Sequence, residues 1–305
     1  LPWDQVDYIM PTHSFYFDQA TNMVPFLGND HGNRSYMAGK HMEQSLPLVH
    51  REAPLVQANI LFPAAGGSSM TMEDILGHDF SVHAPEAGTV GNIDDKNMTI
   101  DLTGESGTKH KVPFYRNFHL NNGSILDSTI LVKPGDKVKA GELMADTNST
   151  KDGVLAIGAN LNVGYLPYKG YNFEDGLVIS ESAADKLTSE HSTVEELVPE
   201  EGDIVNKKAF SAYAPTLYTS EQLKNIDDDG VIKEGSIVNP GDPLILYLKK
   251  KVITAENNML GRISKALNMP YKIAPIDWDY AVPGEVITVS RFGGGIKVII
   301  KTKSQ

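Results

Sequence analysis

The sequence predicts a β-rich α+β fold built from barrel-like and hairpin-rich modules. From about residue 80 onward, short apolar runs alternate with turns containing Gly and Pro, which is the pattern of many short strands. Few segments carry helix-start signals or apolar residues at helical spacing. At 305 residues the chain can hold one large domain or two to three small ones, and its 41% hydrophobic residues are enough to build hydrophobic cores.

Four helices are expected, each from a start signal or from apolar residues at helical spacing. They cover residues 32–46 with Asp30 as N-cap, 181–188 with Ser180 as N-cap, 220–226 opened by the capping-box match from Thr219 to Gln222, and 254–269. The last part returns to strands at 286–289 and 297–300, joined by a glycine turn at 293–295.

Two segments of similar composition place apolar residues on both sides of glycine-containing turns. They are LVKPGDKVKAGELM at 131–144 and VNPGDPL at 238–244. We expect two β-hairpin corners of similar construction, since a repeat architecture would need a shorter, reiterated period.

Charge and cysteine content narrow the function classes. The formal net charge is −12 and the sequence pI is about 5.2. A protein that binds nucleic acid alone normally carries a basic face, so any such contact here needs a few local Lys and Arg within an assembly. The absence of cysteine excludes disulfides and thiolate metal sites and fits a reducing compartment. No signal peptide and no run of about 18 apolar residues is present, so a cytoplasmic protein without a membrane span is expected.

Residues 164–182, GYLPYKGYNFEDGLVISES, carry the sharpest functional signal. An aromatic and glycine-rich turn leads to the acidic pair Glu174 and Asp175, and an apolar, strand-like run follows at 177–179. Charge beside an apolar strand costs desolvation energy unless it is paired, so this placement indicates a function. Outside its context, a Glu-Asp pair after a turn would be an ordinary solvated loop.

Together with two further blocks, this phrase closely resembles the β (second-largest) subunit of multisubunit DNA-directed RNA polymerases. The block at 152–163, DGVLAIGANLNV, runs directly into the acidic phrase, in the family's order. The block at 25–56 resembles the family pattern that begins Pro-Phe-Leu-x-x-Asp-Asp-Ala-Asn-Arg. Its matching residues are Pro25, Phe26, Leu27, Asp30, Asn33, Arg34, Met37, Gln44 and Pro47.

The resemblance implies roles for five residues. Arg34 would contact the phosphates of the incoming nucleoside triphosphate through its guanidinium fork, which Lys cannot imitate, and Asn33 and Gln44 would line the same region. Glu174 and Asp175 would act in catalysis beside the triphosphate and its second Mg²⁺, with Asp175 reaching the metal only indirectly. Adjacent side chains of a regular strand point to opposite faces, so the backbone must turn at this pair.

The resemblance also implies an architecture and partners. The expected fold is part of a double-psi β-barrel with a barrel-sandwich or hairpin module and a reduced flap domain. The expected parts are an active-site helix and connector at 1–60, the barrel region with the acidic pair at 61–183, the flap (wall) at 184–292, and a return strand at 293–305. Expected partners are a β′-like largest subunit that holds the principal Mg²⁺ ligands, other β-like chains, template DNA, RNA and nucleoside triphosphates. The chain alone would be inactive.

Departures from the family pattern indicate a divergent enzyme and suggest a bacteriophage origin. His31 stands where the family has a second Asp, Glu43 replaces an Arg, and Gly39-Lys40-His41 lacks the family's Asn. The family's Lys-x-x-x-Gly-Asp-Lys block does not follow residues 296–301 within this sequence. Either the β subunit is split between polypeptides here, or these residues are a piece of a longer one.

Two other functions stay open. The segment 131–144 resembles a biotinyl or lipoyl carrier module, although the Met-Lys-Met triplet of such carriers is missing. A purely structural assembly platform is the third reading. The sequence contains no complete metal-binding motif. Residues 225–236 begin like a calcium-binding loop but have Ser236 where the loop needs Glu, so a polar hairpin turn is expected. The glycines at 293–295 lack the following Lys-Ser/Thr of a phosphate loop, and the nine histidines show no zinc spacing.

Overall fold

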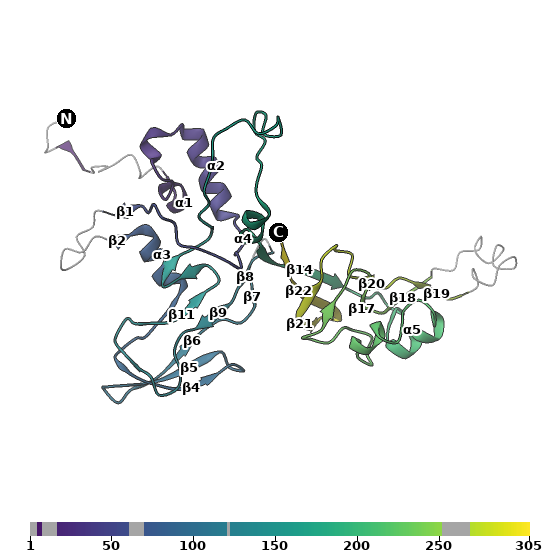
Figure 1. Ribbon diagram of the computed structural model, residues 1–305. Helices are drawn as coiled ribbons and strands as arrows, with labels where there is room; N and C mark the ends of the chain where they lie inside the picture. Colours follow the sequence, from purple (N-terminus) through teal and green to yellow (C-terminus); the bar gives the residue numbers. More distant parts are fainter. Residues whose placement is uncertain (1–4, 8–16, 61–69, 121–122, 252–268) are drawn as a thin grey trace. The chain divides into compact units, whose positions relative to one another are not determined.

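The computed structural model describes residues 5–7, 17–60, 70–120, 123–251 and 269–305. They form two compact units, which we call unit 1 (within residues 1–190, with Gln305) and unit 2 (residues 191–304). Each unit has its own buried apolar cluster. Strands outnumber helices in both, so the predicted β-rich α+β class is confirmed (Figure 1).

Two helices pack against each other near the start of unit 1. α1 (Gln19–Asn22) is capped by Asp18, whose Oδ1 accepts a hydrogen bond of 2.7 Å from the Thr21 backbone N–H. α2 (Gly32–Glu43) approaches α1 at Gly39. A Cβ at Gly39 would lie 3.1 Å from the Thr21 backbone nitrogen and closer still to its Oγ1, so this contact requires glycine.

The predicted ends of α2 are shifted. Its N-cap is His31, not Asp30, and no side chain caps the helix. The Asp30 carboxylate accepts hydrogen bonds from the His31 backbone N–H and the Ser35 hydroxyl, at 2.8 and 3.2 Å, so it does not cap the first turn. The helix ends at Glu43, three residues before the expected end at Leu46.

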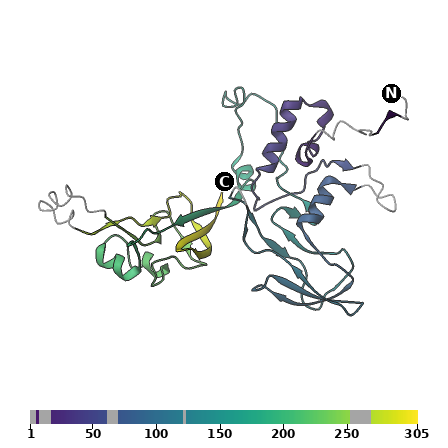
Figure 2. The ribbon, with the colours of Figure 1, turned by 180° about the vertical axis from the view of Figure 1, so that it is seen from behind.

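A third helix, α3 (Met72–Phe80), carries a complete capping box: the Thr71 hydroxyl accepts from the Asp74 backbone N–H, and the Asp74 side chain accepts from the Thr71 backbone N–H. Gly77 lets the helix lie directly on the backbone of the hairpin formed by β12 (Thr150–Lys151) and β13 (Val154–Leu155). In Figure 2, seen from behind, α1 and α2 lie at one end of unit 1 and the largest sheet at the other.

Unit 1 contains several small antiparallel sheets. The largest has the order β10-β4-β5-β6, and a second has the order β3-β11-β9. Their strands are β3 (Val82–His83), β4 (Gly88–Asp94), β5 (Thr99–Gly104), β6 (Lys109–Pro113), β9 (Ser128–Ile130), β10 (Lys137–Val138) and β11 (Leu143–Thr147). The two-stranded pairs are β1 (Asn59–Ile60) with β2 (Met70–Thr71), β7 (Phe118–His119) with β8 (Ile125–Leu126), and β12 with β13.

The two predicted hairpin corners form the expected turns, but their flanking strands do not pair with each other. In the turns 133–136, 139–142 and 239–242, a glycine has positive φ and the fourth residue's carboxylate accepts from the first residue's backbone N–H. β10, however, pairs with β4, and β11 with β3 and β9. The hairpin prediction was therefore wrong, because turn chemistry does not decide which strand is the partner.

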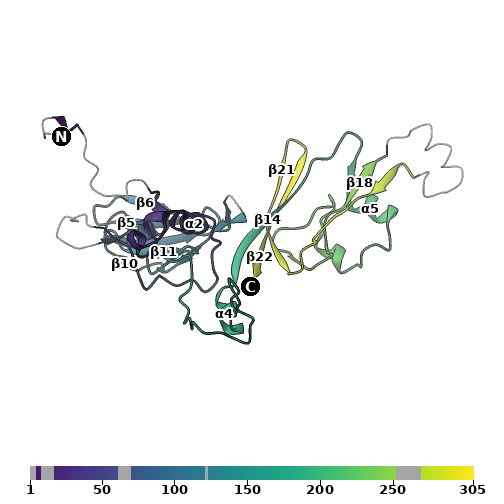
Figure 3. The same cartoon turned by 90° about the horizontal axis from the view of Figure 1, so that it is seen from above.

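Unit 2 is built around a four-stranded sheet of order β14-β22-β21-β16, in which β21 and β22 form a long hairpin (Figure 3). A three-stranded sheet, β15-β18-β19, and the pair β17-β20 complete it. The cluster around fully buried Trp278 and Phe210 fills the core. The elements are β14 (Ser189–Leu197), β15 (Ile204–Val205), α5 (Lys207–Tyr213), η5 (Gln222–Asn225), β16 (Ile237–Val238), β17 (Pro243–Ile245), β18 (Tyr247–Lys250), β19 (Tyr271–Ile273), β20 (Ile276–Asp277), β21 (Gly284–Phe292) and β22 (Gly295–Ser304).

The remaining local predictions have mixed outcomes. Ser180 caps α4 (Glu181–Lys186) of unit 1 as expected, although the helix ends two residues early. Thr219 and Gln222 exchange the predicted capping-box hydrogen bonds, but they open the 3₁₀ helix η5 instead of an α-helix. The glycine turn before β22 and the polar hairpin turn between Ile226 and Ile232 are confirmed. The helix expected at 254–269 lies almost entirely outside the described residues.

Candidate functional site

Asn33 and Arg34 lie together in the first turn of α2, and both are exposed. The Arg34 guanidinium contacts only the sulfur of Met37, at 3.9 Å, among the described residues. The first turn contains no acidic residue, and its backbone N–H groups have no side-chain cap. The Arg34 backbone N–H donates to the His31 carbonyl at 2.9 Å, and the Asp30 carboxylate lies beside this turn. The groups that remain to bind an anion here are the Gly32 and Asn33 backbone N–H groups, which have no acceptor among the described residues, and the Arg34 guanidinium.

Gln44 lies at the opposite end of the same helix. It is the exposed C-cap of α2, ten residues after Arg34. At a rise of about 1.5 Å per residue, the two backbones are separated by about 15 Å along the axis. The structure therefore brings Asn33 and Arg34 together and places Gln44 apart from them.

The acidic pair lies in a tight turn. The Gly176 backbone N–H donates to the Phe173 carbonyl at 3.1 Å, and Glu174 has a φ of +57°, in the left-handed region. The backbone thus turns at the pair, as the sequence analysis required, so the two side chains do not alternate as they would on a strand. Glu174 and Asp175 are both exposed.

The apolar run after the acidic pair was predicted to be a strand, and this was wrong. Leu177, Val178 and Ile179 form no strand, and their exposed fractions are 88%, 50% and 55%. Glu174 and Asp175 are not buried by any described residue, so the argument from desolvation is not supported by the part of the chain that the structure describes. Among the described residues, the run is instead an exposed apolar surface.

The exposed apolar surface covers most of residues 161–180, which we call the acidic loop. The Asn172 side chain holds the middle of the loop, accepting from the Tyr168 backbone N–H at 2.8 Å and donating to the Leu166 carbonyl at 2.6 Å. Its large exposed side chains are Leu161, Val163, Tyr165, Leu166, Tyr168, Tyr171, Phe173, Leu177, Val178 and Ile179. A contiguous exposed apolar segment of this kind marks an interaction surface.

The chain just before and just after the acidic loop is anchored on residues 47–53, which follow α2 after three residues and which we call the anchor segment. The Glu52 backbone N–H donates to the Gly158 carbonyl at 2.9 Å, and the Glu190 backbone N–H donates to the Pro47 carbonyl at 2.8 Å. The Glu52 carboxylate also binds Lys186 of α4 at 2.6 Å. The hydrogen bond from Lys186 lowers the pKa of Glu52 below its ordinary value, with a further contribution from the Asn160 backbone N–H.

Sequence reasoning missed Glu52, Asn160 and Lys186 as residues that position the site. Glu52 and Asn160 fall within the matched blocks 25–56 and 152–163. Their partnership joins residues more than a hundred positions apart, and only the fold shows it. The anchor segment thereby places α2 and the acidic loop on one scaffold in unit 1.

The described residues contain no group of three or more His, Asp or Glu that could hold a metal ion. Glu174 and Asp175 offer two adjacent carboxylates, too few to close a site alone. In the parts of the chain that the structure describes, no helix is both long and apolar enough to cross a membrane.

Comparison with known proteins matches residues 89–304 to the family described as RNA polymerase Rpb2, domain 6. The chain is similar to the DNA-directed RNA polymerase subunit beta of Syntrophomonas wolfei, with 32% identity over 96% of this chain and 26% of that protein. It is 34% identical to the subunit beta of Acidiphilium cryptum over 74% of this chain and 16% of that protein. The subunit beta of Rubrobacter xylanophilus is 32% identical over 95% of this chain and 24% of that protein. The chain thus spans about a quarter or less of the length of these relatives.

Proposed function

Because this chain belongs to the β-subunit family of DNA-directed RNA polymerases, we propose that it works as part of an assembly that copies template DNA into RNA. Its share would be to help bind the incoming nucleoside triphosphate and to guide the RNA and the hybrid. The observation that carries the proposal is the anchor segment, which holds α2 and the acidic loop on one scaffold. The function of a biotinyl or lipoyl carrier module would not require α2 or the acidic loop, and the relatives do not favour the carrier alternative.

Arg34 supplies the phosphate contact in this proposal. Its guanidinium makes no ion pair with a described residue and lies in the same turn as the uncapped N–H groups of α2. A forked cation beside such a helix end is suited to bidentate binding of phosphate oxygens. Asn33, in the same turn, would contact the same ligand, whereas Gln44 would face nucleic acid farther along the helix.

Glu174 and Asp175 would tune the metal that accompanies the triphosphate. Mg²⁺ in nucleotide sites is commonly held by one or two carboxylates together with phosphate oxygens and water. The exposed pair would act on such a site indirectly, through water, with the direct ligands supplied by the β′-like subunit and the substrate. When bound, Mg²⁺ would neutralise charge that develops on the triphosphate. The role of this chain is to hold two carboxylates in a fixed turn.

The finer architecture belongs to the same proposal. The region 61–183 would contribute to a double-psi β-barrel with a barrel-sandwich module, 184–292 would be a reduced flap, and 293–305 would return to the barrel. The exposed apolar surface of the acidic loop supports a protein partner there, because single chains rarely leave such a segment uncovered. A bacteriophage origin stays a prediction.

The test is to purify the native assembly, identify the copurifying chains and assay template-dependent ribonucleotide incorporation. Arg34→Ala should raise the KM for nucleoside triphosphates about ten- to a hundredfold, as expected for lost charged hydrogen bonds. Arg34→Lys should recover only part of this loss, because Lys cannot bind bidentately. Lys40→Ala is the matched control: it removes an exposed cation from the same helix and should leave KM unchanged.

Two results would contradict the proposal. If Arg34→Ala and Glu174→Gln impair assembly but not elongation, the chain is a structural platform. If the protein is recovered alone, with no incorporation activity, a binding module without polymerase function is the better reading.

A further inference from the structure

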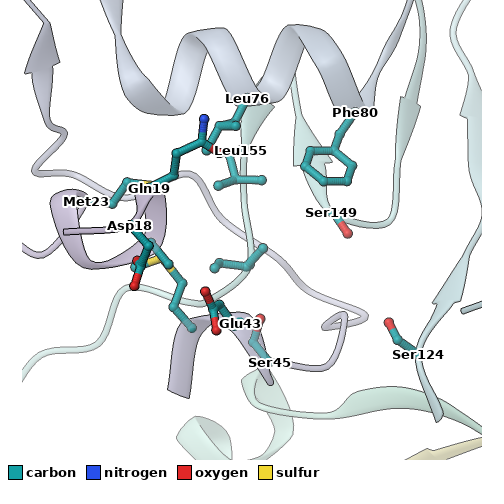
Figure 4. Close-up of a pocket in the computed structure, with 13 residues that line it drawn as sticks. Asp18, Gln19, Met23, Glu43, Ser45, Leu76, Phe80, Ser124, Ser149 and Leu155 are labelled. Atoms are coloured by element: carbon teal, nitrogen blue, oxygen red, sulfur yellow. The ribbon is translucent and has the colours of Figure 1, made fainter. Parts of the chain in front are cut away.

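A pocket of about 590 Å³ opens in unit 1 at the end of α2 away from Arg34 (Figure 4). Its walls come from α1, the last turn of α2, α3 and the β12–β13 region. This volume is within the range of about 300–1,000 Å³ typical of small-molecule sites. None of the five candidate site residues lines it, although Gln44 lies between the lining residues Glu43 and Ser45, and Arg34 is at the other end of α2.

The pocket combines an apolar floor with free hydroxyl groups. Leu155 and Met23 are buried in the floor, and Leu76 and Phe80 of α3 extend it. The lining hydroxyls belong to Ser45, Ser124 and Ser149, and none of them hydrogen-bonds to a described residue. A ligand with a hydrocarbon body can therefore bury it here and still find polar partners.

All charged side chains among the described residues that line the pocket are negative. Among the described residues that line the pocket, the only titratable ones are Asp18 and Glu43, and both are acidic. Figure 4 shows their carboxylates on the α1 and α2 side of the pocket, away from Phe80. Hydrogen bonds from Thr21, its backbone N–H first, lower the pKa of Asp18, so this carboxylate is ionised at neutral pH. The Glu43 carboxylate has no hydrogen-bonding or ionic partner among the described residues.

We propose that this pocket is a binding site for a small organic cation, an alkyl- or arylammonium whose apolar part lies between α3 and β13 and whose ammonium group faces Asp18 and Glu43. The apolar floor supplies most of the affinity, and the carboxylates select the cation over neutral or anionic analogues of the same shape. Because both carboxylates are exposed, the selection is modest, about two- to fivefold in Kd.

Methionine methyl NMR on the full chain tests the proposal directly. Met23 and Met42 line the pocket, whereas Met98 lies elsewhere in unit 1 and serves as an internal control. 4-Phenylbutylamine should shift the first two methyl signals saturably and leave Met98 unchanged. 4-Phenylbutanol should bind about two- to fivefold more weakly, and 5-phenylpentanoate more weakly again.

Amino-acid substitutions distinguish the contribution of the carboxylates to ligand binding from that of the cavity. Glu43→Gln keeps the shape of an exposed side chain and should bring the amine and the alcohol closer to equal Kd values. Glu201→Gln, in unit 2, is the matched control and should keep the full preference. Ser45→Phe should fill the pocket and abolish the shifts for all three probes. The proposal is overturned if no probe gives a saturable shift at Met23 and Met42, or if the anion binds as tightly as the amine.

Discussion

Gly77→Ala should destabilise unit 1 more than any glycine-to-alanine change on an open helix surface. α3 packs on the β12–β13 hairpin at this residue. A Cβ at Gly77 would lie 2.7 Å from both the Leu155 backbone nitrogen and the Val154 Cα, and closer still to the Gly153 carbonyl oxygen. All three neighbours are backbone atoms, so no side chain can rotate away, and the helix or the hairpin must move.

The magnitude follows from two opposing effects. Overpacking of this kind costs about 1 to 3 kcal/mol, and a clash with three backbone atoms belongs at the upper end. Alanine in a helix interior recovers about 1 kcal/mol relative to glycine. The net loss is therefore about 2 kcal/mol, or about 4 to 8 °C in the Tm of a unit of this size.

Hydrogen exchange measured at increasing urea concentration can give the stability of each unit in the same chain. Peptides from α3 and β13 report unit 1, and peptides from β21 and β22 report unit 2, which should be unchanged. Gly32→Ala is the matched control, because a Cβ there meets no atom within 4 Å in the first turn of α2. The packing argument is refuted if Gly77→Ala is as stable as Gly32→Ala.

Three further changes test local interactions. Glu52→Gln should lower the urea midpoint of unit 1 at neutral pH. The effect should shrink as pH falls below 4.5, because the pKa of folded Glu52 is lowered and its stabilisation is lost as pH falls through that lowered value. Tyr218→Phe removes a 2.5 Å hydrogen bond from the Tyr218 hydroxyl to the carboxylate of Asp277, whose pKa is raised by burial. Because that hydrogen bond lowers the pKa of Asp277, ¹³C NMR should show the pKa rise further in the variant. The free energy of unfolding should fall by about 1 kcal/mol at neutral pH and by less at low pH, where Asp277 is protonated. Gly241→Ala, at a φ of +84° in open space, should cost unit 2 about 1 kcal/mol in urea unfolding, and an unchanged midpoint would contradict the need for glycine in that turn.

Features that depend on residues within about four positions of each other could be predicted from the sequence. The Ser180 cap, the reciprocal Thr219–Gln222 hydrogen bonds and the glycine-containing turns all formed, because each is decided by local geometry. Strand partners were not predictable in this way. β10 pairs with β4 across more than forty residues, and nothing in the turn beside β10 distinguishes that partner from its neighbour in sequence.

The same limit, that a local pattern does not identify its packing partner, explains the wrong prediction at the acidic loop. The turn at Glu174 follows from local chemistry, but the apolar run after it was assigned to a strand because an apolar pattern predicts burial without saying what buries the residues. In this chain Leu177 is 88% exposed, while the Asn172 side chain hydrogen-bonds to the loop's own backbone at Leu166 and Tyr168. A segment that is ordered by its own hydrogen bonds and apolar on its outside is preorganised for a partner, since less conformational entropy is lost when it is covered. The apolar run at 177–179 predicts burial, and no described residue of this chain buries it. If the prediction is right, the burying surface belongs to another part of the assembly, as the proposed polymerase function requires.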